Sequence, residues 1–120
     1  MVIIGGPKEV CTASELSFDE EGALRYFRFN AKELAKYKEL VDGGEDIALG
    51  VSDIKELIYA CNIGVKYAIA NKEDAAIMQK IVDCYLYDTK LLAIIYEEDE
   101  IEWAATAEID GVVFDEDEQL

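Results

Sequence analysis

The stretch IALGVSDIKELIYACNIGVKYAIA, residues 47–70, decides the fold of this 120-residue chain. It begins with a short apolar run, residues 47–51, of the kind found in parallel strands that are buried on both faces. Gly64 precedes a second apolar run at residues 65–70. Between the two runs, apolar residues follow the helical spacing i, i+3, i+4 and i+7: Ile54, Leu57, Ile58 and Cys61. A strand, a helix and a second strand in this order predict a βαβ unit with a right-handed crossover.

The same alternation continues on both sides of this stretch. Apolar runs that start at residues 47, 65, 91 and 111 are separated by 18, 26 and 20 residues. A helix is expected from residue 30 to 42 and a short helix near residues 100–105. After Asn71 the sequence predicts a longer helix with these residues facing inward: Ile77, Ile81, Val82 and Tyr85. We therefore expect a mostly parallel open α/β sheet of βαβ units, with three layers and the size of a Rossmann or flavodoxin-like domain.

The first 29 residues have the pattern of strands and turns. Residues 1–4 form a short apolar run, and residues 16–18 and 24–29 flank a polar stretch that ends in Gly22. This pattern predicts an antiparallel β-hairpin at one edge of the sheet. In its second arm, Phe27 and Phe29 share one face, and Tyr26 and Arg28 share the other. One domain over residues 1–120 is expected, with a strand and hairpin region (1–29), an alternating region (30–114) and a solvated acidic tail (115–120).

The charge of the chain is strongly negative and unevenly distributed. The formal net charge is −16, and residues 96–120 contribute 11 acidic residues and no basic one. Such a field repels phosphate backbones and anionic lipid, so we expect no nucleic acid and no membrane partner. It permits a basic protein partner, imitation of nucleic acid by spaced carboxylates, or a divalent cation at the acidic C-terminal segment.

Histidine is absent, which excludes Ser-His-Asp triads, Cys-His pairs and histidine metal ligands. The three cysteines form no C-x-x-C pair, and we expect them to be small buried apolar residues in a cytoplasmic protein. No catalytic residues and no cofactor are predicted.

Polar residues follow the apolar runs at the edge where parallel sheets gather ligands. They are Ser52, Asp53, Asn71, Lys72 and Glu97. Two carboxylates could hold a magnesium ion there, with the lysine facing a phosphate oxygen. Helix capping explains the same residues without a ligand.

Two aromatic residues near the acidic segment are candidates for an interface. Trp103 and Tyr96 are of the types enriched where proteins associate, although Trp103 can equally cover an edge of the core. The expected function is therefore a non-catalytic protein-association module or homo-oligomer. The alternative is a phosphate-binding or magnesium-dependent phosphotransfer protein with its site at the strand ends.

Overall fold

The computed structural model describes residues 1–7, 9–12, 16–17, 24–115 and 119–120. They form an α/β domain with a radius of gyration of 13.3 Å. Its elements, in chain order, are β1 (Val2–Ile4), β2 (Arg25–Arg28), the 3-10 turn η1 (Ala31–Glu33), α1 (Leu34–Asp42), β3 (Ile47–Gly50), α2 (Ile54–Ile63), β4 (Tyr67–Ala70), α3 (Lys72–Cys84), β5 (Lys90–Ile95), α4 (Glu100–Thr106) and β6 (Gly111–Phe114).

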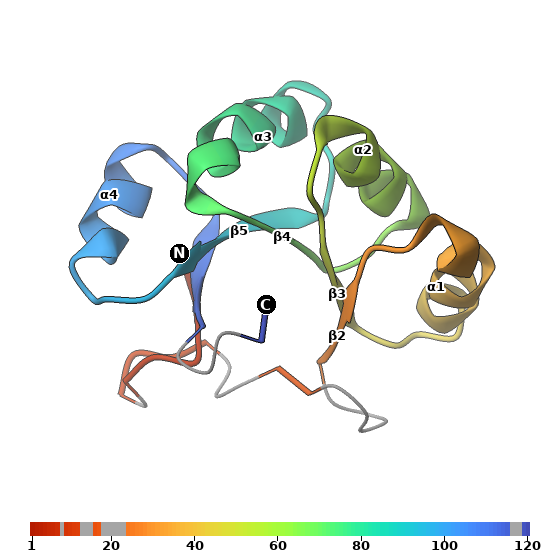
Figure 1. Ribbon diagram of the computed structural model, residues 1–120, viewed down its shortest axis with the longest axis horizontal. Helices are drawn as coiled ribbons and strands as arrows, with labels where there is room; N and C mark the ends of the chain where they lie inside the picture. The colour runs from red at the N-terminus through yellow and green to blue at the C-terminus, as the bar shows by residue number, and fades with distance from the viewer. Residues whose placement is uncertain (8, 13–15, 18–23, 116–118) are drawn as a thin grey trace.

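The six strands make one sheet in the order β1-β6-β5-β4-β3-β2, and every pair in it is parallel. From β2 to β6, each helix connects a strand to its immediate neighbour, always in the same direction along the sheet. Crossovers of one hand therefore place all four helices on one face, which is the convex face in Figure 1. The α/β class and the parallel sheet are confirmed. The three-layer arrangement is wrong, because helices on both faces need a reversal of strand order that this sheet lacks.

The predicted antiparallel hairpin is also wrong. Residues 25–28 do form a strand, but β2 pairs in parallel with β3, from Arg25 opposite Ile47 to Arg28 opposite Gly50. The described residues of the expected first arm, 16 and 17, contribute an isolated parallel bridge between Ser17 and Arg25. Residue 18 and the turn, residues 19–22, lie outside the described residues. Each face of β2 carries one aromatic side chain, Tyr26 on the inner cluster and Phe27 on the outer one, so the strand packs on both sides of the sheet while it pairs with β3 at the edge.

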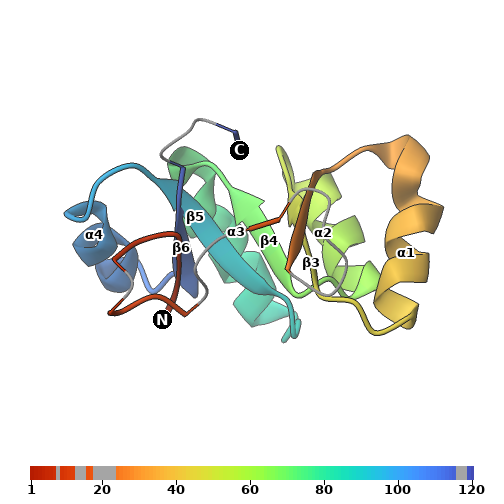
Figure 2. The same ribbon diagram turned by 90° about the horizontal axis from the view of Figure 1, so that it is seen from below.

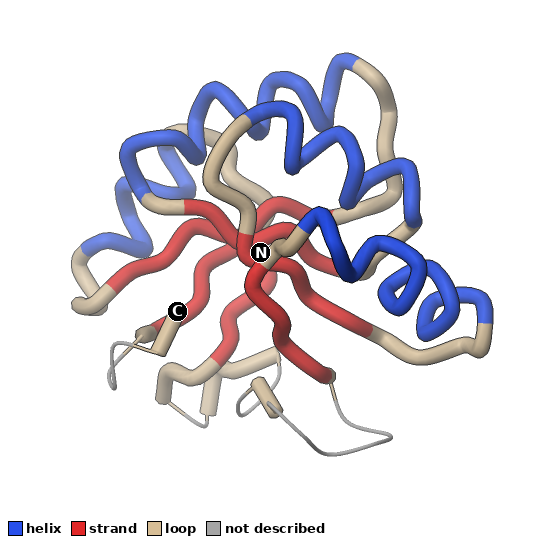
Figure 3. The backbone as a smooth tube through the Cα atoms, turned by 45° about the vertical axis from the view of Figure 1, so that its right-hand side comes forward, coloured by secondary structure: helices blue, strands red, loops and turns tan. Residues whose placement is uncertain are grey.

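The sheet is buried on both faces by two separate clusters. The outer cluster fills the space between the sheet and the helices, and Phe27 and Phe29 pack against it. The inner cluster lies on the concave face, contains Tyr26, and is covered by side chains from outside the regular elements: Leu16, Leu24 and Leu120. Figure 2 looks at this face with the helices behind the strands, and Figure 3 shows the loops gathered on the side opposite the helices. A sheet without helices on one face thus still meets the requirement that parallel strands be covered on both sides.

Part of the expected solvated tail is buried. Asp115 is only 6% exposed, and Leu120 packs against the inner cluster. Residues 116–118 of that tail lie outside the described residues. The expectation of solvent exposure is therefore wrong for Asp115, because its carboxylate accepts hydrogen bonds from the N–H groups of Gln119 and Leu120, and Leu120 covers the concave face beside it.

The buried face of α3 differs from the one expected. Its buried residues are Ala75, Met78, Gln79 and Val82, whereas Ile77 is 58% exposed and Tyr85 is exposed. Cys61 is buried as expected, but Cys84, at the end of this helix, is exposed. In the part of the chain that the structure describes, no helix has the length and apolar character needed to cross a membrane.

Candidate functional site

The residues predicted to form a site all follow carboxyl ends of strands, as expected. Ser52 and Asp53 follow β3, Asn71 and Lys72 follow β4, and Glu97 follows β5. Because the strands are parallel, these residues lie along one edge of the sheet. The structure divides them into two groups, one at the start of α2 and one between α3 and α4.

The first group caps α2. The Asp53 carboxylate accepts a hydrogen bond of 2.8 Å from the Glu56 N–H, and the Glu56 carboxylate accepts one of 2.8 Å from the Ser52 N–H. Asp53 is thus the N-cap residue, in place of Ser52. These reciprocal bonds satisfy backbone donors that a helix start leaves free.

The second group surrounds the Glu100 carboxylate. Lys72 Nζ lies 3.4 Å from Glu100 Oε2 and 4.9 Å from the centre of the Trp103 ring. Glu100 Oε1 accepts hydrogen bonds from the N–H groups of Tyr96 (3.0 Å) and Glu97 (3.1 Å). The bond from Tyr96, ahead of that from Glu97 and the charge of Lys72, holds the pKa of Glu100 below its ordinary value.

This arrangement bears on the predicted phosphate and magnesium site. The Lys72 ammonium already has an anion and an aromatic ring beside it, and Asn71 begins α3 without a side-chain capping bond. Among the residues that the structure describes, no three Asp, Glu or Cys side chains lie close enough to hold a metal ion. The phosphate, magnesium and divalent-cation interpretations therefore stay predictions, and the described geometry adds no support to them.

Trp103 is half-buried against the outer cluster, under the Lys72 ammonium, and Tyr96 is exposed. Trp103 thus covers an edge of the core. Its further role in an interface, and that of Tyr96, stay predictions.

A hollow of about 570 Å³ lies between the start of α2 and the first half of α3. Ile54 is 43% exposed and Ile77 is 58% exposed, although both were expected in the core. Met78, which is buried, also contributes to the lining. The full lining is Ser52, Asp53, Ile54, Lys55, Asp74, Ile77 and Met78. Two of the predicted site residues, Ser52 and Asp53, therefore belong to a hollow that also presents exposed isoleucines.

Sequence reasoning missed the isoleucines because it assigned them to helix faces by spacing alone. On α3, Ala75, Met78 and Val82 recur at i, i+3 and i+7, which is also a helical stripe, and this stripe is the buried one. Ile77 lies about 100° away from Met78 around the helix. This second apolar stripe, which begins with the small residue Ala75, is the feature of the sequence that indicates the buried face of α3.

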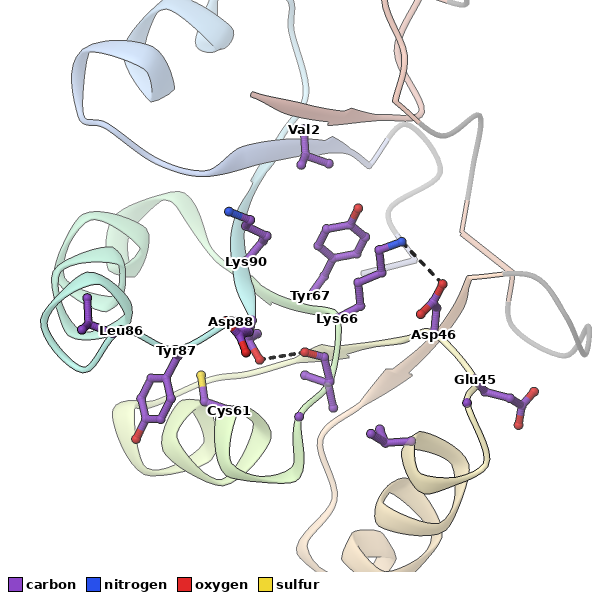
Figure 4. Close-up of a pocket in the computed structure, with 15 residues that line it drawn as sticks. Val2, Glu45, Asp46, Cys61, Lys66, Tyr67, Leu86, Tyr87, Asp88 and Lys90 are labelled. Atoms are coloured by element: carbon purple, nitrogen blue, oxygen red, sulfur yellow. Dashed lines mark hydrogen bonds and ion pairs between the residues drawn. The ribbon is translucent and has the colours of Figure 1, made fainter.

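A larger depression of about 710 Å³ lies at the opposite edge, where strands β3, β4 and β5 begin (Figure 4). Two contacts join polar groups of this depression: Lys66 Nζ lies 3.4 Å from Asp46 Oδ2, and the Thr89 hydroxyl donates a 2.7 Å hydrogen bond to the Val65 carbonyl. Burial raises the pKa of the Cys61 thiol to about 11. At neutral pH this thiol stays protonated, which is unsuited to nucleophilic chemistry.

The fold and these surfaces define the class of the protein: an acidic α/β domain whose curved parallel sheet carries the four helices of the described residues on one face. Comparison with models of known protein families finds no family that matches the chain, and comparison with curated sequences finds no significant relative.

Proposed function

We propose that this protein is a non-catalytic association module that binds a basic, amphipathic segment of a partner protein in the hollow between α2 and α3. The observation that carries the proposal is the pair of exposed isoleucines, Ile54 and Ile77, which come from two helices and line the same hollow. Apolar surface that is gathered in one concave place favours a partner more than scattered apolar residues do.

The lining of the hollow suits an apolar side chain. Removing the exposed parts of two isoleucines from water gives a favourable free energy in proportion to the apolar area that a partner covers. Met78 lies beside them, and its unbranched thioether adapts to partner side chains of different shapes. An amphipathic helix supplies apolar residues at i, i+3, i+4 and i+7, which fit a hollow of this kind.

The charges around the hollow favour a basic partner over a second copy of the chain. Among the described residues that line the hollow, Asp53 and Asp74 are acidic and Lys55 is the only basic one. Glu73 and Glu56 stand in the first turns of the same two helices. With a net charge of −16, two copies repel each other, whereas a basic segment is attracted.

We place this function in the cytoplasm. All three cysteines are free, including the exposed Cys84, which is expected in a reducing compartment.

A model peptide tests the proposal directly. The probe is a helix of about 14 residues made of lysine and leucine, with the leucines at i, i+3, i+4 and i+7, and binding is measured by titration calorimetry. We expect binding to the unaltered chain, weakening by roughly tenfold in Ile77→Ser, because a central apolar contact is lost. Raising the salt from about 0.02 M to about 0.3 M should also weaken binding, since the acidic rim is then screened.

The control variants distinguish binding in this hollow from binding to other exposed apolar residues. Leu86, just beyond α3, is 86% exposed and does not line the hollow, so Leu86→Ser should bind the peptide as the unaltered chain does. A peptide with glutamate in place of lysine should not bind. Equal weakening by Ile77→Ser and Leu86→Ser would show that the peptide binds elsewhere. Light scattering that detects a dimer, abolished by Ile77→Ser, would assign the hollow to a second copy instead.

A further inference from the structure

At the carboxyl ends of the strands, the opening of the concave face, here called its mouth, brings together polar residues from strands that are far apart in the sheet. Tyr26 and Arg28 belong to β2, at one edge, and Asp115 follows β6, near the other edge. Because the sheet is curved, the carboxyl ends of these two strands face each other (Figure 1). Arg28 Nη1 donates a 2.9 Å hydrogen bond to the main-chain oxygen of Leu120, which is five residues beyond Asp115. Tyr26 lies on the same concave side, where burial raises the pKa of its hydroxyl; Arg28 lowers this pKa and the Asp115 charge raises it.

These residues hold a piece of peptide by its main chain. Asp115 Oδ1 accepts a 2.8 Å hydrogen bond from the Gln119 N–H, and both Asp115 oxygens lie 3.3 Å from the Leu120 N–H. Arg28 takes the carbonyl of the same segment, and the Leu120 side chain packs against the inner cluster. Two donors, one acceptor and one apolar side chain of the segment are thus recognised together.

The position of this contact is that of a ligand site. In parallel α/β sheets, ligands bind outside the carboxyl ends of the strands, and both Arg28 and Asp115 stand at such ends. Gly50, opposite on β3, keeps the space open for the Tyr26 side chain, because a Cβ at this position would overlap the Tyr26 hydroxyl. Asp115 is only 6% exposed, and an ionised carboxylate is a better hydrogen-bond acceptor for N–H groups than a neutral oxygen.

We infer that the mouth formed by Arg28 and Asp115 is a binding site for a short peptide segment with a leucine side chain, and that residues 119–120 occupy it within the same chain. This site uses the concave face and none of the residues of the α2–α3 hollow, so it does not depend on the function proposed above.

Occupation by the chain's own tail controls access to the site. A short tether holds a segment at an effective concentration on the order of 1 mM. If the same segment as a free peptide binds with a Kd of about 100 µM, the tether raises the apparent Kd of any competing peptide by roughly tenfold. A foreign peptide therefore binds well only when the tail is displaced.

The experiment opens the site in the full-length chain. In Leu120→Asp, a carboxylate replaces the side chain that packs against the inner cluster, so the tail should leave its place. The probe is the peptide Ser-Ser-Ser-Gln-Leu with an uncharged fluorophore on its N-terminal amine, whose neutral spacer avoids repulsion from the acidic protein, and binding is measured by fluorescence anisotropy. We expect the peptide to bind Leu120→Asp roughly tenfold more tightly than the unaltered chain.

Two matched arginine variants test the geometry in the Leu120→Asp background. Arg28→Gln should weaken peptide binding by roughly tenfold, because a charge-assisted hydrogen bond is lost. Arg25→Gln, on the same strand but with its guanidinium over the Phe27 ring, should leave binding unchanged. A folded Leu120→Asp chain that does not bind the peptide, or binds a peptide ending in aspartate equally well, would overturn the inference.

Amide hydrogen exchange on the unaltered chain gives a second measurement that needs no opened variant. The Gln119 and Leu120 N–H groups should exchange at least about tenfold more slowly than in an unstructured peptide, and Arg28→Gln should reduce this protection. Exchange at the unstructured rate in the unaltered chain would refute occupation of the site by its own tail.

Discussion

Replacing Gln79 tests how the helix layer is joined to the sheet. Gln79 lies on α3 and is 2% exposed. Its Oε1 accepts a 2.8 Å hydrogen bond from the Asp110 N–H, and its Nε2 donates a 2.9 Å bond to Asp83 Oδ1. Asp110 in turn accepts bonds from the N–H groups of Leu91 and Val2. One buried amide therefore orients the turn that joins three strands.

The magnitude follows from which groups lose their partners. In Gln79→Leu, the Asp110 N–H loses its acceptor in a partly buried place, which costs about 1–3 kcal/mol, and each lost hydrogen bond costs about 1 kcal/mol. The added apolar burial of leucine offsets about 1 kcal/mol. We expect a net loss of about 2 kcal/mol in the free energy of unfolding, measured by urea denaturation at 25 °C.

Two further variants separate the two bonds of Gln79. Asp83 is exposed, and Asp83→Ala removes only the bond to Gln79 Nε2, so it should cost about 1 kcal/mol. Gln79→Glu keeps an acceptor for Asp110 but places two carboxylates together, so it should be destabilised at pH 7 and recover near pH 4, where the pair holds a proton. A Gln79→Leu chain within 0.5 kcal/mol of the unaltered one would refute this reasoning.

Two other predictions concern the sheet edge and alkaline pH. A Cβ at Gly111 would overlap the Val2 carbonyl oxygen and lie 2.7 Å from Leu92 Cδ2, so Gly111→Ala should force β1 away from β6 and cost about 3 kcal/mol of unfolding free energy. Gly44 has positive φ and open space around it, so Gly44→Ala should cost only about 1 kcal/mol in the same urea assay. Equal costs for the two variants would contradict the close approach of Gly111 to β1. Burial raises the pKa of the Cys61 thiol in the folded chain from 9.0 to about 11. Between pH 9 and pH 11 the thiol therefore ionises more readily in the unfolded chain, so the stability that this shift gives the folded chain below pH 9 is lost over this range. The free energy of unfolding should fall by about 1–3 kcal/mol over that range, and Cys61→Ala should show a smaller fall; equal falls in both chains would exclude the thiol as the cause.

The central βαβ units could be predicted from the sequence because their apolar runs and helical spacings are local. Strands β3 to β6 begin within two residues of the predicted runs. The partners of β1 and β2 could not be predicted, since pairing of residues 2–4 with residues 111–113 depends on contacts more than 100 positions apart. No local pattern distinguishes a parallel edge strand from the arm of a hairpin.

The candidate site could be predicted only in part. Topology correctly placed Ser52 and Lys72 at one edge of the sheet, but the direction of each side chain depends on capping bonds and on Glu100. The exposed Ile77 was missed because polar Gln79 takes a place in the core that spacing reserves for apolar residues. A buried amide with two partners is a tertiary feature, and a helical pattern cannot reveal it.

The two faces of the sheet are covered in different ways, and this difference explains the positions of the α2–α3 hollow and of the mouth formed by Arg28 and Asp115. The four helices lie on the convex face (Figure 1), and the hollow between α2 and α3 is lined by two exposed isoleucines, Ile54 and Ile77. In the described part of the chain no helix lies on the concave face, and side chains from outside the regular elements cover it, among them Leu120 near the carboxyl ends of the strands, where ligands gather. Because the sheet separates the two surfaces, Ile77→Ser and Arg28→Gln should act independently. Their effects on stability should therefore add within about 0.5 kcal/mol, and coupling beyond that would show that the sheet transmits a change from one face to the other.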